Sequence, residues 1–106
     1  MTTMNEIRDY AAKIAERFRP EKIILFGSQA RGSSNCNSDV DLLVLMEYEG
    51  SGMRQAVKIR QAVRSPFPLD LVVRHPEEFG HGSAPLSYFL RNVRQDGIVL
   101  YDRGNS

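Results

Sequence analysis

Two aspartates at the start of an apolar run are the residues of this sequence best suited to chemistry. Asp39 and Asp41 flank Val40 in the segment S-D-V-D-L-L-V. Side chains alternate between the two faces of a strand, so both aspartates are expected on one face, opposite Val40 and Leu42. Neighbouring carboxylates repel each other, and a hard divalent cation offsets that repulsion. The pair therefore predicts a site for magnesium, which completes its shell with water and phosphate oxygens.

A glycine-serine turn after an earlier apolar run supplies groups that can hold phosphate. Gly27 and Ser28 follow the segment I-I-L-F directly. Glycine lets the backbone approach a phosphate closely, and serine offers a hydroxyl and an N–H at the start of a helix. We expect Gly27 and Ser28 to hold the β and γ phosphates of a nucleoside triphosphate, beside metal ions bridged by Asp39 and Asp41.

Such a site would catalyse nucleotidyl transfer. An acceptor oxygen would attack the α-phosphorus of the triphosphate in line, and pyrophosphate would leave. Two metal ions about 3.5–4 Å apart would stabilise the attacking and the leaving oxygens. The alternative is that Asp39 only caps a loop and that Asp41 is a charge on a solvated edge strand. The glycine-serine turn favours the metal site.

The two segments together resemble a family signature. Residues 27–32 (G-S-Q-A-R-G) and 38–42 (S-D-V-D-L) are similar to the G-S-x-A-R-G and S-D-x-D-L motifs of the polymerase-beta-like nucleotidyltransferases. The resemblance spans nearly the whole chain, and within the superfamily the chain looks like a minimal nucleotidyltransferase. It implies a third carboxylate on a later strand, and Asp70 in P-L-D-L-V-V fits that position. By this resemblance, Asp70 would hold the ion that lowers the pKa of the acceptor hydroxyl and would take its proton.

The resemblance also implies a substrate and a partner. Minimal nucleotidyltransferases are often antitoxins of HEPN-domain toxins, so the expected reaction is magnesium-dependent transfer of AMP from ATP to a tyrosine of such a toxin, in a hetero-oligomer. Two other functions stay open. One is a binding module that neutralises a partner protein by covering it, without catalysis. The other is transfer to a small molecule or to an RNA end.

Several further residues near these segments have more than one interpretation. Arg31 would neutralise triphosphate charge or form a structural salt bridge. Ser38 is a nucleotide-binding candidate, but a hydrogen bond with the loop backbone is the favoured interpretation. His75 and His81 lie in proline- or glycine-rich segments at a spacing that matches no metal motif, so surface roles are expected. Cys36, in a polar loop, is expected to be a bystander.

Length and composition limit the class of protein. The chain has 106 residues, 42% of them hydrophobic and 25% charged, which predicts a single globular domain over residues 1–106. A net charge of +1 gives no global attraction for nucleic acid. One cysteine excludes an internal disulfide and is consistent with a reducing cytoplasm. No apolar run approaches the ~20 residues that cross a bilayer, so we expect a cytoplasmic protein without membrane contact. The family resemblance implies a prokaryotic one.

Helix and strand signals alternate along the chain. Thr3 and Glu6 have the spacing of a capping box, which predicts the start of a helix. Pro20 follows the apolar residues that recur at helical intervals and predicts the end of that helix. In the strand with Asp70, alternation puts the aspartate opposite Leu69 and Leu71. The order predicts an α/β (α+β) fold of the polymerase-beta type, a small mixed sheet with helices packed mainly on one face. The expected strands cover residues 22–26, 40–45, 69–73 and 98–101. The expected helices cover residues 4–18, 29–32, 53–64 and 86–93, the last of them capped at its C-terminal end by Gly97, and a further helix is expected to start within 75–79. Residues 33–38 are an expected loop, and residues 80–83 an expected flexible break between helices.

Overall fold

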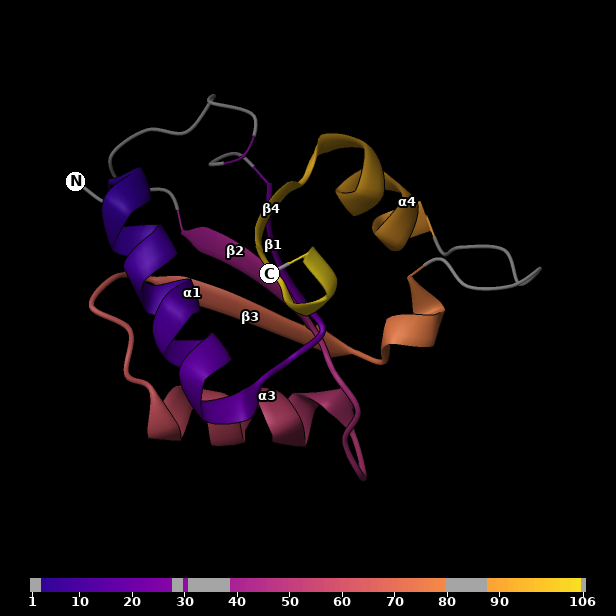
Figure 1. The fold of residues 1–106 in the computed structure, drawn as a ribbon, viewed down its shortest axis with the longest axis horizontal. Helices are drawn as coiled ribbons and strands as arrows, with labels where there is room; N and C mark the ends of the chain where they lie inside the picture. Colours follow the sequence, from indigo (N-terminus) through magenta and orange to yellow (C-terminus); the bar gives the residue numbers. More distant parts are fainter. Residues whose placement is uncertain (1–2, 28–29, 31–38, 80–87, 106) are drawn as a thin grey trace.

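A computed structural model describes residues 3–27, 30, 39–79 and 88–105 of the chain (Figure 1). The predicted helix over residues 4–18 and the predicted strands over 22–26 and 40–45 are confirmed at both ends. The elements are α1 (Met4–Phe18), β1 (Lys22–Phe26), β2 (Val40–Leu45), α3 (Gly52–Ala62), β3 (Leu69–Arg74), the 3-10 helix η1 (Pro76–Glu78), α4 (Tyr88–Asp96), β4 (Ile98–Asp102) and the 3-10 helix η2 (Arg103–Asn105).

The remaining element predictions differ from the structure only at their ends. Helix α3 starts at Gly52, one residue before the expected start, because Ser51 caps it by accepting a hydrogen bond from the Arg54 N–H. It ends at Ala62, two residues before the expected end, and the next residue, Val63, is extended. Strands β3 and β4 each run one residue further than expected, to Arg74 and Asp102. Ala30 is helical, but the rest of the turn predicted over 29–32, the loop over 33–38 and the interruption over 80–83 lie outside the described residues.

The four described strands form one mixed sheet in the order β3-β2-β1-β4. Strand β1 pairs antiparallel with both β2 and β4, whereas β2 and β3 are parallel. A parallel pair needs a crossover rather than a tight hairpin, and α3 supplies it between β2 and β3. The mixed sheet predicted from the sequence is therefore confirmed.

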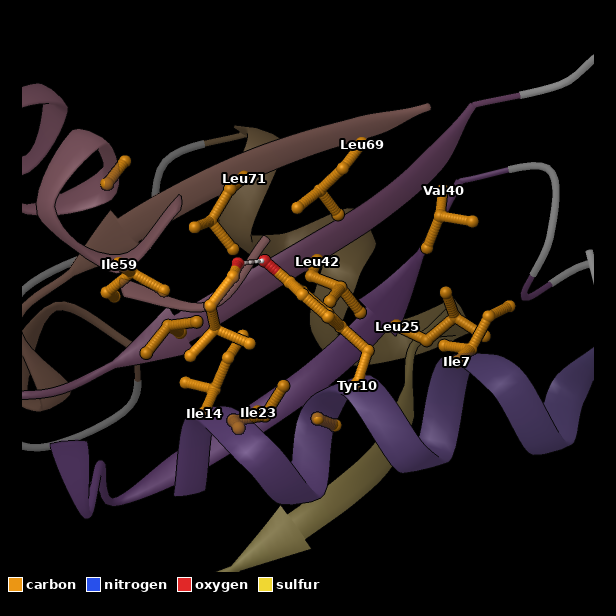
Figure 2. Close-up of a cluster of buried hydrophobic side chains, with 14 of the residues drawn as sticks. Ile7, Tyr10, Ile14, Ile23, Leu25, Val40, Leu42, Ile59, Leu69 and Leu71 are labelled. Carbon is orange, nitrogen blue, oxygen red and sulfur yellow. Dashed lines mark hydrogen bonds between the residues drawn. The ribbon is translucent and has the colours of Figure 1, made fainter. Parts of the chain in front are cut away.

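Helices α1 and α3 cover one face of the sheet. In α1 the capping box forms as predicted: the Glu6 N–H donates to the Thr3 hydroxyl (3.2 Å) and the Thr3 N–H donates to the Glu6 carboxylate (3.1 Å). The helix ends at Arg19, which adopts a left-handed φ of 47° before Pro20. Its apolar stripe packs on the inner sides of β1, β2 and β3 (Figure 2), and the buried residues of α1 are Ile7, Tyr10, Ala11, Ile14 and Ala15.

One buried polar group in this core has a partner. The Tyr10 hydroxyl donates a hydrogen bond, drawn as a dashed line in Figure 2, to the Val63 carbonyl oxygen at 2.8 Å. The Tyr10 ring packs edge-on against Phe67 with centroids 5.5 Å apart. Val63 lies directly after α3, so the bond ties α1 to the end of α3. Burial raises the pKa of Tyr10 above 10.0, and nearby Arg60 offsets part of that rise.

Helix α4 lies on the opposite face of the sheet, apart from α1 and α3 (Figure 1). The prediction that helices pack mainly on one face holds for α1 and α3, and α4 is the exception. Gly97 ends α4 as predicted, since its N–H donates to the Val93 carbonyl oxygen at 2.7 Å. A Cβ there would lie 2.6 Å from Cγ2 of Ile24, so glycine lets the chain turn closely against β1. The second core holds Ile24, Leu43, Leu45, Leu90 and Val93.

Candidate active site

Strand register brings two of the three predicted carboxylates together. Asp41 of β2 and Asp70 of β3 are Cα partners in the parallel pair. Their neighbours Val40, Leu42 and Leu71 are buried in the core under α1 and α3, while Asp70 is exposed and Asp41 is half-buried. The alternation predicted from the sequence is confirmed for both strands. The two carboxylates therefore stand side by side on one face, about one strand spacing apart (~4.8 Å).

Asp39 lies at the corner where this strand pair begins. It directly precedes β2 and is exposed. The N–H of the next residue, Val40, donates to the Pro68 carbonyl oxygen at 2.9 Å. This bond joins the starts of the two strands that carry Asp41 and Asp70. All three predicted aspartates are thus at the amino ends of β2 and β3.

The glycine turn closes on the same carboxylates from β1. Phe26, the last residue of β1, is the register partner of Asp41, and Gly27 follows with a φ of 76°. An L side chain rarely adopts that φ. A Cβ placed on Gly27 would lie only 2.2 Å from Oδ2 of Asp41. The absence of a side chain at Gly27 is therefore what leaves room for the Asp41 carboxylate beside the turn.

The positions of the three aspartates suit a hard cation, although their carboxylate oxygens do not point to one common position. Among the described residues, the donor atoms of Asp39, Asp41 and Asp70 do not form a group in which all lie within 4.8 Å of one another. Asp39 and Asp70 are exposed, so rotation of their side chains meets little steric resistance. Carboxylate oxygens on one face, beside an open glycine turn, are the donor set that magnesium prefers. The three aspartates fit the predicted metal.

Two hollows flank the carboxylates. One, of about 200 Å³, lies beside the glycine turn under α4 and is lined in part by Gly27, Phe26 and Phe89; the two phenylalanine rings pack edge-on with centroids 5.2 Å apart. The other, of about 360 Å³, runs along β3 beside α3. Its lining includes Asp70, Arg60 and exposed Met53. The site can therefore be approached from two sides.

Four of the predicted site residues are placed by the structure and three are not. Gly27, Asp39, Asp41 and Asp70 come together as described above. Ser28, Arg31 and Ser38, predicted to contact the nucleotide, lie outside the described residues, as do Cys36 and His81. Their roles stay predictions.

The sequence matches the profile of the nucleotidyltransferase domain family over residues 7–100. The chain belongs to this nucleotidyltransferase family. The match covers β1, β2 and β3 with the site residues on them and the first part of β4, and it confirms the resemblance seen in the sequence motifs. No curated relative matches this nucleotidyltransferase.

Solved structures share the fold of this nucleotidyltransferase. A candidate nucleotidyltransferase from Sulfolobus solfataricus superposes with a TM-score of 0.68 at 20% identity, covering 96% of this chain and 82% of that one. A toxin-antitoxin with AMP-PNP gives a TM-score of 0.60 at 23% identity, with 92% and 75% covered. An aspartate-to-glutamate double mutant of the toxin-antitoxin MntA-HpeT gives 0.60 at 21% identity, with the same coverage. These likenesses confirm the predicted fold.

The sequence interpretation missed one cluster elsewhere in this nucleotidyltransferase. Glu47, His75 and Glu77 offer donor atoms that all lie within 4.8 Å of one another. Only a surface role is predicted for His75 from the sequence, because its spacing to His81 matches no metal motif. The available signal was topological: Glu47 closely follows β2 and His75 directly follows β3, so the two meet once β2 and β3 are parallel neighbours.

The described part of the chain contains no helix long and apolar enough to cross a membrane.

Proposed function

We propose that this nucleotidyltransferase is a magnesium-dependent enzyme that transfers AMP from ATP to a tyrosine hydroxyl of a HEPN-type toxin, and thereby acts as the antitoxin. The observation that carries the proposal is the pairing of Asp41 with Asp70 in parallel register, with the Gly27 turn against the Asp41 carboxylate. A carboxylate pair alone is common on a protein surface. A carboxylate pair beside a turn that has no room for a side chain is what a metal-bound triphosphate requires.

In the proposed reaction, each residue at the amino ends of β2 and β3 has one task. Asp39 and Asp41 hold the metal ions between them, and the backbone at Gly27 lies against the phosphates that leave. Asp70 accepts the proton of the acceptor hydroxyl as that oxygen attacks the α-phosphorus, and pyrophosphate departs. Bound magnesium would supply positive charge at the attacking and leaving oxygens. Asp70 is exposed on the outer strand, which suits contact with an incoming acceptor.

The two hollows support separate binding places for the nucleotide and for the acceptor. The hollow beside Gly27 has two phenylalanine rings in its lining, which suits the nucleotide. The hollow beside Asp70 combines apolar Met53 and Val57 with the cation of Arg60, which suits a protein surface. The acceptor would therefore approach along β3 and α3, and the nucleotide would enter from the side of α4.

The choice of substrate and partner rests on relatives. One structural neighbour is a toxin-antitoxin with AMP-PNP, an adenine nucleotide, and others are mutants of the toxin-antitoxin MntA-HpeT. These neighbours support ATP as the donor and a toxin as the acceptor. The near-neutral net charge of +1 supports a protein acceptor over nucleic acid.

Label transfer tests the proposal. The purified protein, magnesium and ATP labelled at the α-phosphate are added to a lysate of the host, and labelled species are separated and identified by mass. We expect a single labelled protein that carries AMP on tyrosine. The label should be absent with the Asp39→Asn, Asp41→Asn double variant and present with Asp9→Asn. Asp9 is the matched control because it is an exposed aspartate on α1, paired with Lys13 rather than with the site.

Other outcomes would select the alternatives. Label in RNA or in a small metabolite would keep the chemistry and replace the acceptor. If no nucleotide is transferred and the double variant still neutralises its partner in a stable complex, the protein is a binding module. The toxin-antitoxin structural neighbours favour this binding module over transfer to RNA or to a small metabolite.

A further inference from the structure

A second group of possible metal ligands lies beyond the opposite ends of the strands that carry the aspartates. Strands β2 and β3 have six residues each, and Asp41 and Asp70 are at their second positions. Glu47 lies two residues after the end of β2, and His75 directly follows the end of β3. At about 3.3 Å per residue, more than about 13 Å of strand separates the two groups. The second group is therefore not part of the candidate active site.

The backbone holds this second group in place. The Met46 N–H donates to the Arg74 carbonyl oxygen at 3.1 Å, which fixes the chain after β2 against the chain after β3. Glu47 and His75 are the next residues on the two segments. The His75 N–H donates to the Glu78 carboxylate at 2.9 Å, so Glu78 caps η1, and Glu77 is the neighbouring carboxylate that completes the group.

The imidazole of His75 is held in one plane but lacks a hydrogen bond at one nitrogen. The Tyr48 ring stacks on it with centroids 4.0 Å apart and an angle of 9° between the planes. The Tyr48 hydroxyl is in turn 3.4 Å from the Val73 carbonyl oxygen. Within the described part of the chain, Nδ1 of His75 is buried and has no hydrogen-bond partner. A buried imidazole nitrogen without a partner is costly unless something else binds it.

The distance between His75 and Glu47 matches two ligands on one ion. Nδ1 of His75 lies 3.4 Å from Oε2 of Glu47. That contact is an ion pair only when the imidazole is protonated. Two donors at about 2.0–2.2 Å from a tetrahedral zinc are roughly 3.3–3.5 Å apart. The observed separation equals that spacing, so a zinc ion would fit between the two atoms.

The negative charge around His75 also favours a bound cation. Glu47 and Glu77 are exposed carboxylates beside His75, and Glu78 is adjacent. A divalent cation would offset the mutual repulsion of the carboxylates. One imidazole with two carboxylates is a donor set that zinc accepts, whereas magnesium prefers oxygen alone.

We propose that Glu47, His75 and Glu77 bind a zinc ion that links the segment after β2 to the segment after β3, separately from the candidate active site. The fourth position would be taken by water. Glu77 has to come closer by side-chain rotation, since the three donor atoms lie within 4.8 Å of one another rather than within a full ligand shell. Binding would order the segments on which Glu47 and Glu77 lie.

Zinc titration tests this site in a background that lacks the thiol and two of the three aspartates of the candidate active site. The chain carries Cys36→Ser, which removes the only thiol, together with Asp39→Asn and Asp41→Asn. After treatment with a chelator, Zn²⁺ binding is followed by calorimetry and Co²⁺ binding by visible absorption. We expect one ion per chain, and at least a ~100-fold loss of zinc affinity on His75→Gln or Glu77→Gln, since even outer-shell changes cost 10–100-fold. Magnesium should not compete.

Matched variants separate ligation from folding. His81→Gln changes the other histidine of the chain and Glu49→Gln changes a nearby exposed glutamate, and neither should alter zinc affinity. Circular dichroism of each variant checks that the fold is retained, and Glu77→Gln alters an exposed side chain that the core does not need. Zinc binding that is undiminished in both His75→Gln and Glu77→Gln, or no zinc binding in the starting background, overturns the proposal. Neither result bears on nucleotidyl transfer.

Discussion

Replacing Gly27 by alanine tests the geometry that joins the glycine turn to the carboxylates. Two costs are expected. The left-handed φ of 76° costs an L-residue roughly 1–2 kcal/mol. In addition, the new Cβ would lie 2.2 Å from Oδ2 of Asp41, which forces the carboxylate or the turn to move. Overpacking of this kind costs about 1–3 kcal/mol more.

Gly50→Ala is the matched control for the backbone cost alone. Gly50 has nearly the same φ, 77°, but a Cβ added there would have no other atom within 4 Å. The difference in the free energy of unfolding between the two variants, measured by urea denaturation, therefore isolates the clash with Asp41. We expect Gly27→Ala to be the less stable by at least about 1 kcal/mol, or about 4–8 °C in Tm.

A double-mutant cycle assigns the clash to its partner. In an Asp41→Ala background the carboxylate is gone, so Gly27→Ala should there cost no more than Gly50→Ala does. Nucleotidyl transfer by Gly27→Ala should fall by about 100-fold or more, because Asp41, the proposed metal ligand, would be displaced by about 1 Å. Equal stability of Gly27→Ala and Gly50→Ala, together with full transfer activity, would refute the reasoning.

Three further substitutions test other parts of the structure. Asp70→Asn should abolish label transfer while urea denaturation shows a loss of less than about 0.5 kcal/mol, because the side chain is exposed on β3; retained transfer would remove Asp70 from the mechanism. Tyr10→Phe should lower the free energy of unfolding by about 1–2 kcal/mol, since the Val63 carbonyl loses its donor. Because burial raises the pKa of Tyr10 above 10.0, its contribution is fully present below pH 10 and is lost as the pH rises through the folded-state pKa, so the wild type should lose more stability than Tyr10→Phe between pH 9 and 11. Gly97→Ala should lower Tm by several degrees, since its Cβ would lie 2.6 Å from Ile24; an unchanged Tm would mean that α4 shifts without cost.

Local signals account for what could be predicted from the sequence. The ends of α1 follow from the Thr3–Glu6 capping box and from Pro20, which act within a few residues of the helix they bound. Alternation in β2 and β3 correctly separated the aspartates from the buried side chains, because side-chain direction in a strand depends only on its period of two. The family was predictable because its motifs are short and continuous.

Relations between distant segments could not be predicted in the same way. That Asp41 faces Asp70 depends on β2 and β3 being parallel and in that register, which neither strand specifies alone. The same pairing brings Glu47 to His75, and that contact was missed. The position of α4 on the face opposite α1 and α3 depends on where Gly97 lets the chain turn back toward β1.

The place of β3 at the rim of the described sheet affects how large an acceptor the enzyme could serve. Strand β3 is paired only with β2, so no further strand of the described sheet stands outside Asp70. A bulky acceptor could then present a hydroxyl to Asp70 by touching the outside of the molecule, without threading into a deep cleft. A folded macromolecule is large enough to cover the outer side of Asp70 and to exclude water from it.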